Sequence, residues 1–159
     1  MLASGVAVGT VVAPPNEVIA QRQGAHLVID SEPDQIQLQQ VGLVLGHDWL
    51  NQNRDTALNV MKACVAAAYR WKTDRPFTEG VISKWLNTDD QDVIDSAYTY
   101  MSSALPQVPY PSRDGFVEQI KEVGTLTPDA LNVNPDACFD NSLVQELDSS
   151  GFINQIYGA

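Results

Sequence analysis

The side chains best suited to metal or nucleophilic chemistry are two histidines and two cysteines, and they form no recognisable motif. His26 has no second metal ligand four residues away within an expected helix. His47 has no second metal ligand at a recognised zinc-binding spacing. Cys64 and Cys138 are too few for a disulfide scaffold or a four-cysteine zinc site. Their spacing leaves open whether they pair with each other. Neither a nucleophile elbow nor a P-loop occurs. We therefore expect no catalytic residue, no metal and no cofactor.

Three neighbouring aspartates could do acid–base chemistry, but their position favours a structural role. Asp89, Asp90 and Asp92 stand where a helix is expected to begin, and negative charge interacts favourably with the N-terminal end of a helix dipole. Thr88 and Gln91 have the spacing of a capping box. We interpret all three carboxylates as part of a helix start.

The sequence Pro14-Pro15-Asn16-Glu17 is a more promising place for ligand binding. It follows an apolar, β-branched segment at 6–12 that predicts a buried strand, and it precedes a short helix that Gly24 would end. In open α/β sheets, ligands bind outside the carboxyl ends of strands, and free N–H groups at a helix start can bind an anion. An ordinary turn is the alternative.

Other elements follow from hydrophobic periodicity, prolines and capping residues. Two further strands are expected at 26–30 and 41–46. Helices are expected at 48–53, 55–73, 74–86, 89–105, 112–124 and 141–150, with a short terminal anchor at 152–158. Cys64 and five aromatic residues are expected in the core: Trp71, Trp85, Tyr98, Tyr100 and Tyr110. Three strands form too small a sheet to bury the apolar faces of so many helices. Either the helices pack on one another, or a sheet is completed by chain outside this sequence.

Composition limits the possible partners. The 159 residues include 20 acidic and 9 basic ones, giving a formal net charge of -11. A strongly negative chain repels phosphate backbones and anionic lipids, so neither nucleic acid nor a membrane surface is an expected partner.

No apolar stretch reaches the ~20 residues of a transmembrane helix. The first basic residue is Arg22, so the apolar start lacks the positive region of a signal peptide.

Four segments together resemble the C-terminal half of a family of ABC-transporter substrate-binding proteins, the group for sulfonates, nitrate, taurine and thiamine precursors. They are LASGVAVGTVVAPPNEVIAQRQGAHLVID, VGLVLGHDWLNQNRDTALNVMKACVAAAYRWKTDRP, VPYPSRDGF and LDSSGFINQIYG. Their order and spacing cover nearly the whole chain. The resemblance is to the family as a whole, so it does not identify the ligand.

The resemblance implies a partial α/β fold of the type II periplasmic-binding class, rich in helices and with few strands. Residues 1–40 would end lobe two and include the hinge connection, and 41–159 would be the returning part of lobe one. The implied function is a non-enzymatic solute-binding component, or a fragment of one, that closes around a small organic ligand and delivers it to ABC permease subunits. The backbone at Pro15 and the side chains of Asn16 and Glu17 are the expected ligand contacts, although Glu17 disfavours an anion unless it faces away.

The same resemblance implies a periplasmic or other extracytoplasmic location, without direct membrane insertion. Two alternatives stay open. One is a relative of the thiamine-pyrimidine synthases that lacks its active half, since no clustered histidine and cysteine site is present. The other is a stand-alone helical interaction protein, which predicts a complete core without further chain.

Overall fold

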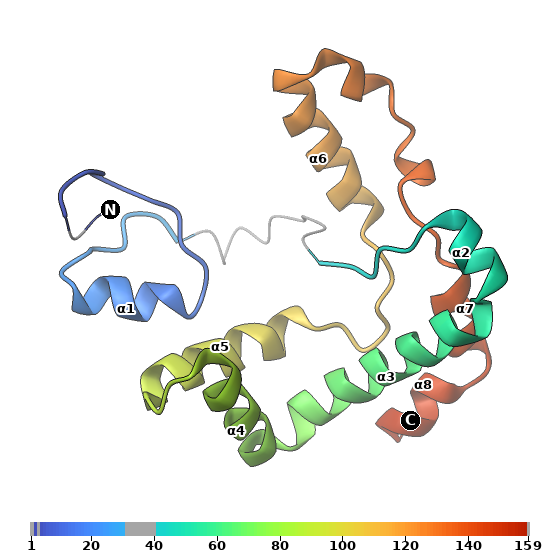
Figure 1. The fold of residues 1–159 in the computed structure, drawn as a ribbon, viewed down its shortest axis with the longest axis horizontal. Coiled ribbons are helices and arrows are strands. Elements are labelled where there is room, and N and C mark those ends of the chain that lie inside the picture. Colours follow the sequence, from blue (N-terminus) through green and yellow to red (C-terminus); the bar gives the residue numbers. More distant parts are fainter. Residues whose placement is uncertain (1, 3, 31–40, 159) are drawn as a thin grey trace. The chain divides into compact units, whose positions relative to one another are not determined.

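A computed structural model describes residues 2, 4–30 and 41–158, and every regular element within these ranges is a helix (Figure 1). None of the described helices combines the length and the apolar character needed to span a bilayer. The elements in order are α1 (Asn16–Arg22), α2 (His47–Gln52), α3 (Arg54–Thr73), α4 (Arg75–Leu86), α5 (Gln91–Ala104), α6 (Arg113–Leu126), the 3-10 helices η1 (Pro128–Asn132) and η2 (Pro135–Ala137), α7 (Ser142–Ser149) and α8 (Phe152–Tyr157).

The predicted α/β fold is therefore wrong for the described chain. The segments 6–12, 26–30 and 41–46, which were expected as three strands, form neither strand nor helix. A helix satisfies its backbone hydrogen bonds within one segment, whereas a strand needs a neighbouring strand. The apolar, β-branched pattern alone could not supply that neighbour. The partial type II periplasmic-binding fold is corrected to an all-helical arrangement.

The predicted helices form, and Asp74 and Ser112, the first residues of two of the expected ranges, act as N-caps. Asp74 accepts a hydrogen bond from the Phe77 N–H at 3.3 Å and begins α4. Ser112 accepts one from the Gly115 N–H at 3.0 Å and begins α6. The capping box expected at the start of α5 is wrong, because Asp90 is the N-cap of that helix.

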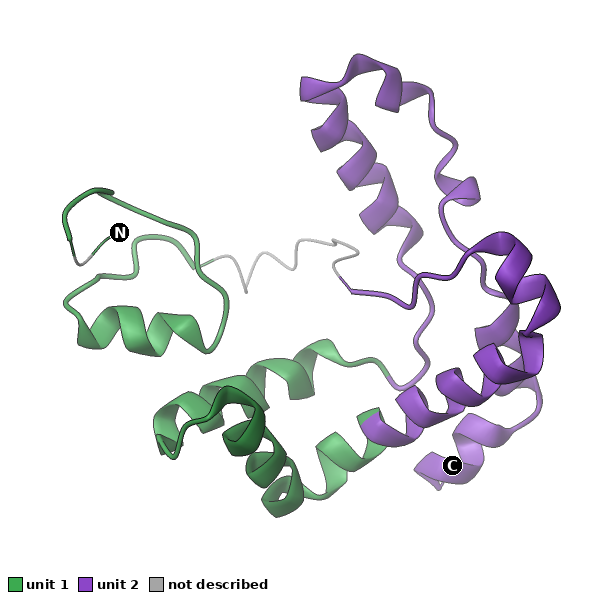
Figure 2. Ribbon diagram, viewed as in Figure 1, with its two compact units in different colours: residues 1–30, 68–106 green, residues 31–67, 107–159 purple. Residues whose placement is uncertain are grey.

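The chain divides into two compact units, coloured separately in Figure 2. The first unit comprises the described residues within 1–30 and 68–106. Its core is small and consists of Ile82, Ile94 and Ala97, with Trp71 and Tyr98 packed against them. These side chains come from the end of α3 and from α4 and α5. The core therefore holds a helical hairpin to the end of the long helix.

The second unit comprises the described residues within 31–67 and 107–159. Its most buried side chains are Val65 of α3, Leu147 of α7 and Ile153 of α8, each at most 2% exposed. Leu58 and Met61 lie on the same face of α3 as Val65, because residues three and four apart share one face of a helix. Burial of this apolar stripe is what packs α7 and α8 on α3.

Candidate functional site

The predicted ligand-binding turn lies at the start of α1. The peptide bond between Pro14 and Pro15 is cis, and Pro15 precedes the first helical residue, Asn16. The Asn16 side chain is exposed, whereas Glu17 is half-buried. The turn therefore exists as predicted, but it follows an irregular segment rather than a strand.

Glu17 points from α1 to α5. Its Oε1 accepts a short hydrogen bond from the hydroxyl of Ser96, a residue 79 positions further along the chain. Its Oε2 is buried and has no hydrogen-bond partner among the described residues. Buried carboxylate oxygens nearly always accept a hydrogen bond, and leaving one without a partner costs about 1–3 kcal/mol or more. The geometry thus leaves an acceptor at the contact of α1 with α5 that suits a hydrogen-bond donor.

Arg22, at the other end of α1, joins the same two helices. Its guanidinium forms ion pairs with both Asp90 and Asp92. The hydrogen bond from Arg22 lowers the pKa of Asp90 below its ordinary value, and Asp90 in turn raises the pKa of Arg22. Asp90 also accepts a hydrogen bond from the Asp92 N–H at 3.1 Å. The predicted structural role of these aspartates at a helix start is confirmed for Asp90 and Asp92.

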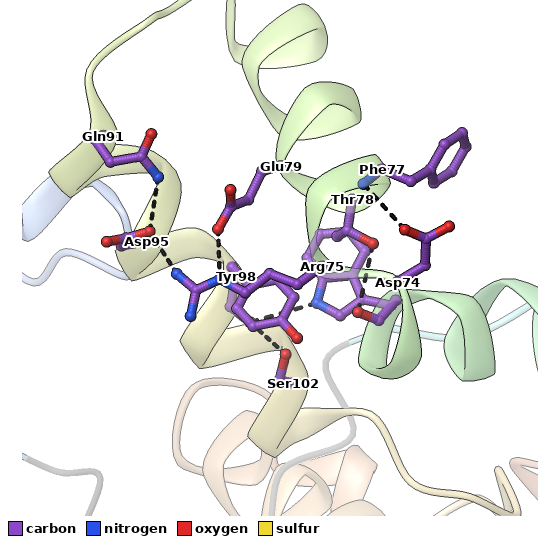
Figure 3. Close-up of polar contacts among 10 residues, drawn as sticks. Asp74, Arg75, Phe77, Thr78, Glu79, Gln91, Asp95, Tyr98 and Ser102 are labelled. Atoms are coloured by element: carbon purple, nitrogen blue, oxygen red, sulfur yellow. Dashed lines mark hydrogen bonds and ion pairs between the residues drawn. The ribbon is translucent and has the colours of Figure 1, made fainter.

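Arg75 lies at the centre of a polar network between α4 and α5 (Figure 3). It donates from Nε to Glu79 and from Nη2 to Asp95 at 2.7 Å. The guanidinium carbon lies 4.6 Å from the centre of the Tyr98 ring, within range of a cation–π interaction. Gln91 donates a further hydrogen bond to Asp95 at 2.9 Å. Because the cation has two carboxylates and an aromatic face, this network joins two helices rather than offering a free binding group.

A second polar surface lies in the second unit, as an open groove of about 670 Å³. Arg54 donates to Ser142 at 3.1 Å and to Glu146 at 2.9 Å. The Tyr110 hydroxyl donates to Asp148 at 3.1 Å, and its pKa is raised by burial and by that carboxylate. The polar groups that line the groove thus bond mainly one another. The remaining lining residues are Gln145 and Ser149.

The histidines and cysteines are exposed. His26 and His47 lie at the surface, and no three His, Cys, Asp or Glu side chains in the described ranges are placed to hold a metal ion. Cys64 and Cys138 are both free thiols, so the possible bridge is not formed. The expectation that Cys64 is a core residue is wrong. It stands one position before the buried Val65, about 100° around the helix from the apolar face.

The aromatic residues divide between core and surface. Trp71 and Tyr98 pack on the core of the first unit, and the Trp71 indole donates to the Tyr98 carbonyl at 3.4 Å. Tyr100 is half-buried. The expectation of core packing is wrong for Trp85, which is 80% exposed, and for Tyr110, which is 42% exposed. Trp85 stands three positions after the buried Ile82, on the same side of α4, but it lies in the last turn of the helix, where its side chain is left uncovered.

The sequence indicated Glu17 as a candidate ligand contact but did not indicate Ser96 as its partner. It also did not indicate that Arg22 is the cation that pairs with Asp90. Neither contact has a local signal, because each joins residues more than sixty positions apart. Only the surplus of carboxylates around position 90 indicated that a cation should be found nearby.

Comparisons with models of protein families, with curated proteins and with solved structures found no significant match. The resemblance to substrate-binding proteins therefore rests on the four sequence segments alone.

Proposed function

We propose that this chain is a solute-binding component of an ABC importer, or part of one, and that its ligand carries a hydrogen-bond-donating group. The observation that supports a ligand of this kind is the buried Oε2 of Glu17, which has no partner among the described residues. The exposed amide of Asn16 stands next to it in the chain and can both donate and accept. The transport function itself is inferred from the resemblance in sequence.

Among the solutes that the resemblance implies, the thiamine-precursor pyrimidines fit this acceptor best. An aminopyrimidine presents N–H donors beside ring nitrogen acceptors, which match the carboxylate of Glu17 and the amide of Asn16. Taurine offers an ammonium donor but also a negatively charged sulfonate, and alkanesulfonates and nitrate carry negative charge without any N–H donor. They would be repelled by Glu17 in a chain whose net charge is already -11.

Ligand entry requires α1 to separate from α5, because Glu17 Oε2 is closed to solvent. The ion pairs of Arg22 with Asp90 and Asp92 hold the two helices together. A ligand that bonds Glu17 only when α1 returns to α5 would favour the closed state by its differential affinity. Release to permease subunits outside the cytoplasm completes the proposed role.

Isothermal titration calorimetry with an aminopyrimidine, taurine, an alkanesulfonate and nitrate tests the proposal. We expect the aminopyrimidine to bind most tightly. Glu17→Gln replaces the acceptor oxygen or turns it into a donor, so it should weaken binding by about tenfold or more, corresponding to about 1.4 kcal/mol. Glu79→Gln is the matched control, because Glu79 is also half-buried but bonds Arg75.

Two results would count against different parts of the proposal. If all four solutes have dissociation constants above about 10 mM, the solute-binding function is wrong. A dissociation constant of ~1 mM already corresponds to a binding free energy of only 4.1 kcal/mol. If the aminopyrimidine binds equally well to Glu17→Gln and to the unmodified chain, the function stands and the site is wrong.

A helical interaction protein is the second candidate, and it is favoured by the exclusively helical elements of the described chain. It requires no small ligand and predicts cooperative unfolding with little binding of hydrophobic dyes. Dye fluorescence during thermal unfolding separates the two candidates. Strong dye binding at low temperature would contradict a self-sufficient helical module, because it reports exposed apolar surface.

A further inference from the structure

The first part of the chain has an unusually apolar and uncharged surface. No ionisable side chain stands before Glu17. Val6, Val8 and Val11 are 72%, 107% and 98% exposed. Large exposed apolar surface that is contiguous in the chain is typical of an interaction site, whereas single exposed apolar residues are common.

The backbone of the same segment is also available for bonding. No backbone-to-backbone hydrogen bond joins residues 6–12 to any other described residue. Burial of this surface would therefore require a partner that supplies both apolar side chains and backbone donors and acceptors. A partner whose contact surface is charged would find no counter-charge here, so the segment favours a partner that is itself apolar and uncharged.

We propose that residues 5–13 bind the same residues of a second copy of this chain, side by side in opposite directions. With the twofold axis at Gly9, Val6 of one copy faces Val12 of the other, and Val8 faces Thr10. These four residues alternate along the segment, so an extended segment would present them on one side. All four are β-branched, and such side chains pack well when they face one another across paired backbones.

The charge distribution makes this association dependent on salt. Each copy has a net charge of -11, but none of that charge comes from a side chain of the contact segment. Two copies therefore repel each other at a distance while their contact surfaces do not. Added salt screens the repulsion, since the Debye length falls from about 10 Å at 0.1 M to about 3 Å at 1 M. A contact that depended on a basic partner would instead weaken with salt.

The contact is expected to be weak. A standard interface buries about 800 Å² on each partner, and nine small residues without an aromatic side chain provide less. The segment must also straighten when it binds, which costs conformational entropy. We therefore expect a dimer whose dissociation constant lies in the range of about 10 µM to 1 mM, the weaker part of the usual scale.

Sedimentation velocity of the full chain across this range, at about 50 mM and about 500 mM NaCl, tests the proposal. We expect the weight-average mass to rise with concentration toward that of a dimer, and to rise further at high salt. Val8→Lys should remain monomeric, because it places two like charges in the contact. Val44→Lys is the matched control: Val44 is 91% exposed and also lies in an uncharged segment without helix.

Both variants change the net charge equally, from -11 to -10, so a difference between them reports the contact and not the overall charge. Far-UV circular dichroism of each variant establishes that its helices are retained. The proposal is wrong if the unmodified chain stays monomeric at 1 mM, if Val44→Lys abolishes association as Val8→Lys does, or if salt weakens association. None of these outcomes depends on solute binding, so the dimer and the proposed function are tested separately.

Discussion

Two helical glycines in different surroundings allow a sharp test of the packing. Gly80 lies within α4, and a Cβ built there meets no atom within 4 Å. Gly124 lies within α6, and a Cβ built there would lie 2.6 Å from Cγ of Leu131 in η1. Glycine in a helix interior is less favourable than alanine by roughly 0.5–1 kcal/mol. Alanine is therefore expected to stabilise the chain at Gly80 and not at Gly124.

The expected change in the free energy of unfolding depends on the atoms that surround each glycine. Gly80→Ala should raise the free energy of unfolding by about 0.5–1 kcal/mol, because the gain in helix propensity meets no steric cost. Gly124→Ala has the same gain, but overpacking costs about 1–3 kcal/mol. Leu131 is a flexible side chain that is 59% exposed, so it can turn outward and the cost lies near the lower end. The net effect is a loss of about 0–1 kcal/mol.

Thermal and urea unfolding followed by far-UV circular dichroism measures both effects. A difference of about 1–2 kcal/mol between the two variants corresponds to about 2–8 °C in Tm for a chain of this size. The double variant Gly124→Ala with Leu131→Ala should recover the propensity gain, because the clashing atoms are removed. The packing of η1 on α6 is contradicted if Gly124→Ala alone stabilises the chain as much as Gly80→Ala does.

Three further predictions concern the core and the charged contacts. Leu147→Ala should lower the free energy of unfolding by about 2–5 kcal/mol in urea titrations, since Leu147 is 1% exposed; a loss below 1 kcal/mol would contradict its core position. Arg22→Gln should raise the pKa of Asp90 toward 3.8, measured by carbon NMR of the carboxyl groups. Because the folded pKa of Asp90 is lowered, its stabilisation is complete above the unfolded pKa and disappears as pH falls through the folded value; an unchanged pKa would refute the Arg22 contact. Asp148→Asn should lower the pKa of Tyr110 toward 10.0 in ring NMR titrations, but not all the way, because burial contributes most to the rise. The stabilisation from Tyr110 is complete below its unfolded pKa and is lost as pH rises through the folded one, so an equal or higher pKa in the variant would be inconsistent with the contact.

Local patterns in the sequence predicted the helices well. Hydrophobic periodicity predicted the helix at 55–73, and in the structure one face of α3 buries Val65 at 2% exposure with Leu58 and Met61 packed beside it. Asp74 and Ser112 identified the starts of α4 and α6. These predictions succeed because both helix periodicity and capping depend on residues within a few positions of one another.

The predicted strands failed because strand formation depends on a distant partner. Val6 and Val8 have the β-branched pattern of a buried strand, but the described chain supplies no neighbour to bond them. The candidate site was half predicted for the same reason. Local sequence placed Glu17 at a turn, whereas its contact with Ser96 depends on the packing of α1 against α5.

The resemblance to solute-binding proteins remains a proposal about function, and Glu17 is the residue on which it can be tested most directly. The deciding measurement is the heat of binding of an aminopyrimidine to the unmodified chain and to Glu17→Gln under identical conditions. The proposal predicts binding that weakens by about tenfold or more when Oε2 can no longer accept as a carboxylate. The absence of binding to the unmodified chain would contradict the proposed function.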